Sequence, residues 1–248
     1  MAFTYRQAYV GLAYEFTDAP GPVTVFCPGF KSDMQGTKAL HLWQLCQSQG
    51  HAMLRFDYSG HGASSGNFAS GTISDWTADA AHIIAKILPK RDIILVGSSM
   101  GGWISLLLAR TLGPRLKALL LIAPAPDFTE LLIRPILTES QRETLQTAGL
   151  ITTPSLYGDP TPITQKLLED GAKNLVLNAP IPVSCPVTLL HGMADRDVPW
   201  QHSLTLTEQL ESQAVRLIFI KEGDHRLSRE QDLALLEREI LELIRIAG

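Results

Sequence analysis

The chain has 248 residues, of which 45% are hydrophobic and 19% are charged; this composition indicates a folded domain and excludes a disordered protein. Its 21 basic and 25 acidic side chains give a net charge of −4, which argues against non-specific binding to nucleic acid or an anionic membrane. No apolar run is long enough to span a bilayer, and residues 1–7 lack the basic and apolar regions of a signal peptide. The cysteines Cys27, Cys46 and Cys185 are odd in number and widely spaced, so we expect no disulfide framework and a reducing, cytoplasmic location.

Short apolar runs alternate with amphipathic stretches along the chain, and residues 7–16 near its start are typical of a less buried, antiparallel edge. Buried strands are predicted at 23–27, 52–56, 93–96, 118–122, 187–190 and 215–220. Helices are predicted at 37–49, 75–88, 100–112, 200–211 and 231–246. Ser74 is the predicted N-cap of the helix at 75–88. Strands that are apolar throughout are buried on both faces, so the pattern predicts an α/β fold with a mostly parallel sheet flanked by helices.

One long segment, residues 127–181, interrupts this alternation and divides the predicted core into residues 1–126 and 182–248. Helices are predicted inside it at 128–137, 139–147 and 163–172, so we expect a small helical cap. Its apolar side chains either pack the insertion onto the core or line an acyl pocket. The candidates for such a pocket are Phe128, Leu131, Leu132 and Tyr157.

The most informative motif is Gly97-Ser98-Ser99-Met100-Gly101, a G-x-S-x-G pattern between a predicted strand and a predicted helix. In that context the serine sits on a sharp, strained turn, and the residues two before and two after it must be small. Gly97 and Gly101 meet this demand around Ser99. Larger residues stand at the same distances from Ser98. We therefore predict Ser99 as the nucleophile and the Met100 N–H, at the start of the helix, as an oxyanion donor.

An activated serine needs a base, and the base needs a carboxylate that orients it. In proteins with this motif the chain order is serine, acid, histidine. Asp195 and Asp197 both follow the strand predicted at 187–190; Asp195 is favoured because it comes first after the turn. Asp197 would instead cap the next helix. His225 lies in a polar loop after the last predicted strand, and we predict it as the base.

A second oxyanion donor is expected from the loop after the first buried strand. Gly29 lets the backbone turn there, and the Phe30 N–H is the candidate. Cys27 precedes this loop but has no acid or base assigned to it, so we interpret it as a buried structural residue. His191 and Asp195 lack a third ligand at a suitable spacing, and we predict neither a metal nor a cofactor.

Together, the motifs around Ser99, Asp195 and His225 resemble those of the α/β-hydrolase superfamily. The resemblance narrows to the family of abhydrolase domain-containing protein ten and covers nearly the whole chain; the stretches that carry it are 55–60 (RFDYSG), 179–183 (APIPV), 189–193 (LLHGM) and 198–200 (VPW). It implies that these three residues form a catalytic triad and that Phe30 is the donor of the oxyanion loop. It also implies the activity of a mitochondrial acyl-protein thioesterase and acyl-glucuronide esterase. Because the chain lacks that family's targeting extension, we expect a bacterial, cytoplasmic relative or a processed protein of the mitochondrial matrix.

We therefore predict a serine hydrolase that cleaves carboxylic esters or thioesters through an acyl-enzyme, with a small molecule or an acylated protein as substrate. Two other interpretations stay open. One is different chemistry on the same triad, such as carbon–carbon bond hydrolysis or peptide hydrolysis; the other is a catalytically silent protein that binds a small molecule. The sequence is compatible with a monomer and with a homodimer.

Overall fold

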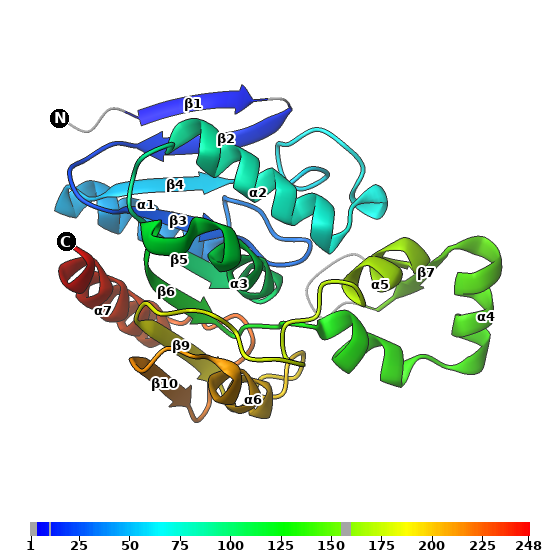
Figure 1. The fold of residues 1–248 in the computed structure, drawn as a ribbon. Coiled ribbons are helices and arrows are strands. Elements are labelled where there is room, and N and C mark those ends of the chain that lie inside the picture. The colour runs from blue at the N-terminus through cyan, green and yellow to red at the C-terminus, as the bar shows by residue number, and fades with distance from the viewer. Residues whose placement is uncertain (1–3, 10, 155–159) are drawn as a thin grey trace.

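The computed structural model describes residues 4–9, 11–154 and 160–248 and confirms the predicted α/β architecture, a mostly parallel sheet flanked by helices (Figure 1). Within these residues, the main sheet has the strand order β1-β2-β4-β3-β5-β6-β9-β10. The strands, in chain order, are β1 Thr4–Tyr9, β2 Leu12–Thr17, β3 Val23–Cys27, β4 Ala52–Phe56, β5 Ile93–Ser98, β6 Leu116–Ile122, β9 Val187–Gly192 and β10 Val215–Ile220. Neighbouring strands from β4 to β10 run parallel.

The N-terminal edge consists of two strands rather than the single, less buried stretch predicted at 7–16. β2 pairs antiparallel with β1 on one side and with β4 on the other. Because β2 has neighbours on both sides, its side chains are mostly buried. The predicted antiparallel direction is confirmed, whereas the predicted exposure is wrong for β2.

Helices cover both faces of the sheet. On one face lie α1 (Thr37–Gln49) and α7 (Glu230–Ala247). On the other face lie α2 (Ile73–Ile87), α3 (Met100–Leu112) and α6 (Gln201–Gln209) (Figure 1). Short 3-10 helices stand at η1 (Phe68–Ser70) and η2 (Gly113–Arg115). Each face encloses its own cluster of buried apolar side chains, as expected for strands that are apolar throughout.

α2 begins two residues earlier than predicted. Its N-cap is Thr72 and not Ser74, because the Thr72 hydroxyl accepts a hydrogen bond from the Asp75 N–H at 3.1 Å. Ile73, at the first helical position, is fully buried and joins the main apolar cluster. The apolar face of the helix therefore begins two residues closer to the preceding loop than the sequence pattern indicates.

The insertion between β6 and β9 is less helical than predicted. Its elements are η3 Thr129–Ile133, η4 Arg134–Ile136, α4 Glu139–Ala148, β7 Leu150–Thr153, β8 Thr161–Thr164 and α5 Gln165–Gly171. The helix predicted at 128–137 is instead a π turn followed by a 3-10 turn, since Pro135 has no N–H to continue a helix. The predicted helix at 139–147 is confirmed, while the antiparallel β7–β8 pair was not predicted. The insertion has its own apolar cluster, formed by Leu137, Leu145, Ile151, Ile163 and Leu168.

One carboxylate holds both ends of the insertion. Asp127, just after β6, accepts hydrogen bonds from the N–H groups of Val176 at 2.9 Å and Leu177 at 2.8 Å. Burial raises the pKa of the Asp127 carboxyl, although these two N–H groups counteract part of the effect. The residue has a φ of 57°, a left-handed conformation that is held in place by these contacts.

The carboxyl ends of β3, β5, β9 and β10 lie along one edge of the sheet. In open α/β sheets this edge is where ligands bind, and the loops that follow these strands carry the predicted site residues. Within the described part of the chain, each helix is too short or too polar to cross a membrane.

Candidate active site

Ser99 is the single residue between β5 and α3, and its backbone is strained. Its backbone has φ 54° and ψ −118°, a conformation that residues other than glycine rarely adopt. The turn is possible because its neighbours are small: a Cβ on Gly97 would lie 2.4 Å from the Gly101 carbonyl oxygen, and one on Gly101 would lie 2.0 Å from the Cys27 carbonyl oxygen. The Ser99 N–H donates to the Ile122 carbonyl at 2.9 Å, which fixes the turn against β6.

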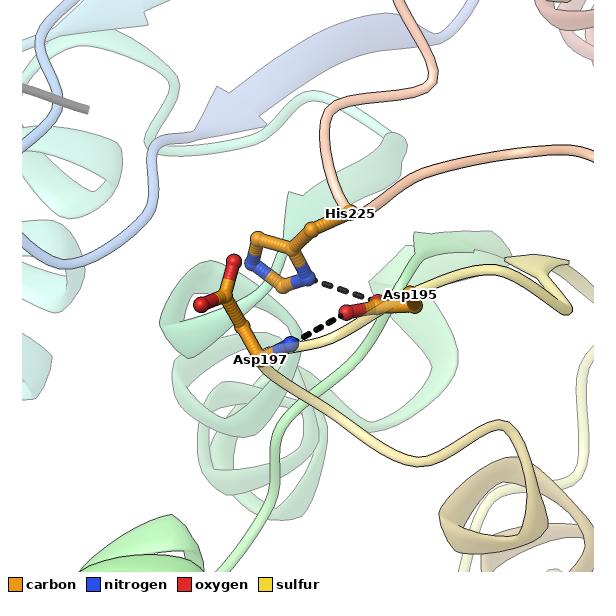
Figure 2. Close-up of side chains that lie close together, drawn as sticks. All are labelled: Asp195, Asp197 and His225. Atoms are coloured by element: carbon orange, nitrogen blue, oxygen red, sulfur yellow. Dashed lines mark hydrogen bonds and ion pairs between the residues drawn. The ribbon is translucent and has the colours of Figure 1, made fainter. Parts of the chain in front are cut away.

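The loops after β9 and β10 bring a histidine and a carboxylate to this serine. His225 Nε2 lies 3.1 Å from Ser99 Oγ. On the other side of the ring, His225 Nδ1 lies 2.7 Å from Asp195 Oδ2 (Figure 2). The His225 side chain is 16% exposed, so it reaches both the buried acid and the solvent-accessible site. The structure therefore brings together the three residues predicted as nucleophile, base and acid.

The Asp195 side chain is fully buried, and each of its oxygens has a donor. Oδ1 accepts hydrogen bonds from the N–H groups of Asp197 at 2.8 Å and Val198 at 2.9 Å, while Oδ2 faces His225. Burial alone would raise the pKa of Asp195, but hydrogen bonds from His191 and His225 outweigh it and hold the pKa well below its usual range. An ionised carboxylate in this position can orient the His225 ring and stabilise it when protonated.

Asp197, the alternative acid, has a different environment. Its side chain is exposed, and its carboxylate lies beside the His225 ring while its backbone N–H points to Asp195 (Figure 2). The prediction that Asp197 caps the next helix is wrong, because α6 has Trp200 at its N-cap and no side chain caps it. The turn before α6 is instead organised around Asp195.

His191 was considered from the sequence only as a metal ligand, and its contact with the acid was not predicted. Its fully buried ring has Nδ1 2.6 Å from Ser203 Oγ and Nε2 3.0 Å from the Val198 carbonyl oxygen. The same Nε2 lies 3.2 Å from Asp195 Oδ2. Its position at the end of β9, four residues before the predicted acid, was the available signal in the sequence.

The loop after β3 runs close to Ser99. A Cβ on Gly29 would lie 3.3 Å from the Ser99 Cβ, so the backbone of this loop and the turn are in near contact. Phe30 follows at the cavity wall, and Met100 begins α3 directly after Ser99. Both predicted oxyanion donors thus belong to segments that border the serine. Burial raises the pKa of the nearby Cys27 thiol to about 11, which keeps it protonated and unsuited as a nucleophile at neutral pH.

Two buried side chains at the end of β4, Arg55 and Asp57, bind the loop after β3 through the backbone of Met34. Asp57 Oδ1 accepts a hydrogen bond from the Met34 N–H at 2.6 Å, and Arg55 Nη1 donates to the Met34 carbonyl at 2.6 Å. Asp57 Oδ2 also accepts from the Ala63 N–H at 2.8 Å, and Arg55 forms a buried ion pair with Glu15. These contacts were not predicted, because they join segments that are distant in the sequence.

The four predicted substrate-binding residues have different fates. Phe128 is buried, with its ring 5.5 Å from that of Phe30 and 5.6 Å from that of Trp103. Leu132 is partly buried against the main apolar cluster, and Leu131 is 49% exposed. Tyr157 lies outside the described residues. None of the first three lines the cavity beside Ser99 in the part of the chain that the structure describes.

This cavity has a volume of about 350 Å³ and opens next to Ser99 and His225. Its other walls come from the loop at 29–33, the first turn of α1 and the start of β8. Within the described residues, the ligand atoms of Asp195, Asp197 and His225 lie within 4.8 Å of one another, as metal ligands would. Asp195 already accepts hydrogen bonds at both oxygens, so the donor set fits a proton relay better than a cation site.

Residues 18–160, which include the loop after β3 and Ser99, match the family model described as serine aminopeptidase, S33. A mouse (Mus musculus) protein named palmitoyl-protein thioesterase ABHD10, mitochondrial, is 38% identical over 246 residues, covering 98% of this chain and 82% of that protein.

Two solved structures share the fold along the whole chain. A putative hydrolase from Agrobacterium vitis S4 is 42% identical with a TM-score of 0.89, covering 98% of each chain. The mouse alpha/beta hydrolase domain-containing protein 10 is 37% identical with a TM-score of 0.89, covering 100% of each chain. The resemblance seen in the sequence is thereby confirmed, and the chain belongs to the serine aminopeptidase S33 family of α/β hydrolases.

Proposed function

We propose that the protein is a serine hydrolase that cleaves carboxylic esters or thioesters. The observation that carries this proposal is the continuous hydrogen-bonded path from Ser99 through His225 to Asp195, with distances of 3.1 and 2.7 Å. A serine hydroxyl is a weak nucleophile until a base takes its proton, and a base at this distance can take it as the new bond forms.

The proposed reaction has two halves linked by an acyl-enzyme. First, Ser99 Oγ bonds to the acyl carbon while His225 Nε2 takes the hydroxyl proton, and the ring then gives this proton to the alcohol or thiol as it leaves. Next, water attacks the acyl carbon, His225 takes a proton from the water, and that proton goes to Ser99 Oγ as the acid leaves. Asp195 stabilises the protonated ring, and the N–H groups of Met100 and Phe30 bind the oxyanion in both halves.

We propose that residues 127–181 act as a cap that supplies the acyl-binding wall. Phe128 connects the start of this segment to the Phe30 ring, and Leu132 packs beside the same apolar cluster. Aromatic and aliphatic side chains of this kind suit an acyl chain better than a polar substrate. The name of the mouse relative, palmitoyl-protein thioesterase, supports an acyl substrate, and it is the reason to test thioesters first.

Peptide hydrolysis is a second candidate, favoured by the description of the matching family model. An aminopeptidase must bind a protonated α-amino group, for which a carboxylate is the natural partner. The cavity beside Ser99 instead presents three cationic side chains, Lys31, Lys38 and Arg226, against the carboxylate of Asp33. This balance of charge disfavours a substrate with a free N-terminus.

Covalent labelling tests the proposal. A fluorophosphonate should add one adduct to the native chain, detected by intact-mass analysis, and none to Ser99→Ala. Ser98→Ala is the matched control, because Ser98 is the adjacent serine but lies in β5, and it should label like the native chain. Labelling of folded Ser99→Ala, or turnover of acyl thioesters by it at the native rate, would show that Ser99 is not the nucleophile.

The predicted location and assembly are part of the same proposal. We propose a cytoplasmic protein or, as the name of the mouse relative states for that protein, a mitochondrial one. A monomer or a homodimer is expected, and light scattering on the purified protein distinguishes the two.

A further inference from the structure

The cavity beside Ser99 is also bordered by His225, the proposed base. His225, Arg226 and Ser228 form one of its walls, and the loop after β3 forms another. In the proposed reaction His225 gives its proton to the departing alcohol or thiol, so the leaving group must lie within reach of its Nε2 atom. The cavity is therefore placed to receive the leaving group.

The charged side chains that line this cavity are mainly cationic: Lys31, Lys38 and Arg226 stand against the single carboxylate of Asp33 in the described lining. Among the described residues that form it, apolar side chains come from Phe26, Phe30 and Ala39 alone. An alkyl chain packed against ammonium and guanidinium groups would displace water from them without replacing its hydrogen bonds, which is costly. The part of the lining that carries the three cations therefore suits a negatively charged group better than a fatty acyl chain.

Lys38 is tied to the loop that carries His225. It stands in the first turn of α1, and its Nζ donates a hydrogen bond to the Arg226 carbonyl at 2.5 Å, which links α1 to the loop that carries His225. Burial lowers the pKa of Lys38 to about 8, although the carboxylates of Asp224 and Asp232 counteract part of the effect. A partly desolvated ammonium gains more from an anionic partner than an exposed one does.

The remaining charged groups support the same sign of ligand. Lys31 Nζ donates to the Pro160 carbonyl at 3.3 Å, so its ammonium extends toward the start of β8 at the cavity rim. The opposing carboxylate, Asp33, accepts a hydrogen bond from the Gln35 N–H at 2.8 Å and so stabilises the turn in which it lies. The first turn of α1 has no acidic residue and no side-chain cap, so its positive end also faces this space.

Resting on the hydrolase function proposed above, we propose that Lys31, Lys38 and Arg226 form a leaving-group subsite that recognises an anion, a carboxylate or a phosphate carried by the departing thiol or alcohol. The recognition follows from the cluster of three cations at the wall of the cavity beside the base. It makes the protein selective for the leaving group as well as for the acyl chain.

Matched thioesters with one acyl chain test this subsite. One pair is S-octanoyl-N-acetylcysteine and its carboxamide, which differ only in the negative charge; the other is octanoyl-4′-phosphopantetheine and octanoyl-pantetheine. We expect kcat/KM for the native enzyme to be at least about tenfold higher for the anionic member of one or both pairs, as one charge-assisted hydrogen bond allows. A carboxylate preference alone or a phosphate preference alone identifies which anion the subsite takes.

Variants locate the effect. Lys38→Gln and Lys31→Gln should each reduce the preference to less than about threefold, mainly through KM, and Lys90→Gln is the control because Lys90 is exposed near the opposite end of the sheet. If Lys38→Gln does not fold, the Lys31 variant still decides the question.

The two proposals fail in different ways. Equal kcat/KM for both members of both pairs, in an enzyme that turns them over, would overturn the subsite and leave the hydrolase intact. An unchanged anion preference in both lysine variants would also overturn it. Absence of turnover together with absence of fluorophosphonate labelling would overturn the hydrolase proposal and the subsite with it.

Discussion

The Nε2 atom of His191 lies 3.2 Å from Asp195 Oδ2, the oxygen that also faces His225 Nδ1. The His191 ring cannot rotate freely, because Ser203 Oγ contacts its Nδ1 and the Val198 carbonyl contacts its Nε2. The carboxylate of Asp195 thus contacts a His191 ring whose orientation is fixed by Ser203 and Val198. We infer that His191 positions the acid of the proposed triad.

Replacing His191 with leucine should lower kcat about tenfold with little change in KM, because Asp195 orients His225 less well. It should also lower the free energy of unfolding by about 1–3 kcal/mol, since buried polar groups lose a partner. His191→Gln, which keeps a donor, should recover most of kcat. Steady-state kinetics with urea unfolding measure both effects, and a native kcat in the leucine variant would argue against a positioning role.

Asp195 and Asp197 differ in burial and in their contact with His225, so their amide variants should differ sharply. We expect Asp195→Asn to lose roughly 10³–10⁴-fold in kcat, because an amide favours the wrong tautomer of the ring. Asp197→Asn, the matched control, should lose less than about threefold, as its carboxylate is exposed. The kcat of each purified variant gives the answer, and the reverse order would move the acid role to Asp197.

Asp57 should affect catalysis through the loop that it holds. Asp57→Asn leaves one of the Met34 and Ala63 N–H groups facing an NH₂ group, which should cost about 1–3 kcal/mol of stability and, by loosening the oxyanion loop, about tenfold in kcat. Asp79→Asn is the control: Asp79 accepts the Ser59 N–H at 2.8 Å and does not touch the Met34 loop. A similar loss of kcat in both variants, at similar loss of stability, would mean a purely structural role.

The strained backbone of Ser99 predicts a gain in stability when the residue becomes glycine. Ser99 has a φ of 54°. The free energy of unfolding should be about 1 kcal/mol higher for Ser99→Gly than for Ser99→Ala, because alanine keeps the backbone strain and glycine removes it. At Ser98, in β5, glycine should be the less stable of the two. Urea denaturation of the four variants measures these differences, and equal stability of the Ser99 pair would rule out stored strain.

The preference for an anionic leaving group should depend on pH in one direction. The pKa of Lys38 is lowered to about 8, so its ammonium is charged below that pH and neutral above it. The charged groups that face it are Asp224, Arg226 and Asp232. The ratio of kcat/KM for the carboxylate and carboxamide thioesters should therefore fall as the pH rises through about 8, and a ratio that is flat from pH 6 to 9 would exclude Lys38.

The sequence predicts the core of the fold well because its elements are continuous apolar runs or amphipathic stretches with clear ends. α1, β4, α3 and β10 match their predicted bounds at both ends. The prediction fails in parts of the insertion, although the helix predicted at 139–147 is confirmed. Ile163 stands four residues before Leu167, a helical spacing, yet it lies in β8 and pairs with Ile151. A short strand of this kind depends on its partner and not on its own pattern.

The site shows the same division. Ser99, Asp195 and His225 follow strands of the sheet, so the order of the motifs suffices to bring them into one region. Asp57 and Lys38 matter through contacts with loops that the sequence does not pair with them, as between Asp57 and Met34. Contacts between distant loops require the three-dimensional arrangement.

The hydrogen bonds from Val176 and Leu177 to Asp127 have an evolutionary consequence. Because the Asp127 carboxylate binds the N–H groups of Val176 and Leu177, the start and the end of the insertion are joined to each other outside the sheet. The segment also packs an apolar cluster of its own. Its length and sequence can therefore drift or be exchanged while β6, β9 and the residues around Ser99 stay unchanged. Such changes would alter the acyl-binding wall proposed for this segment and leave the hydrogen-bonded path from Ser99 to Asp195 in place.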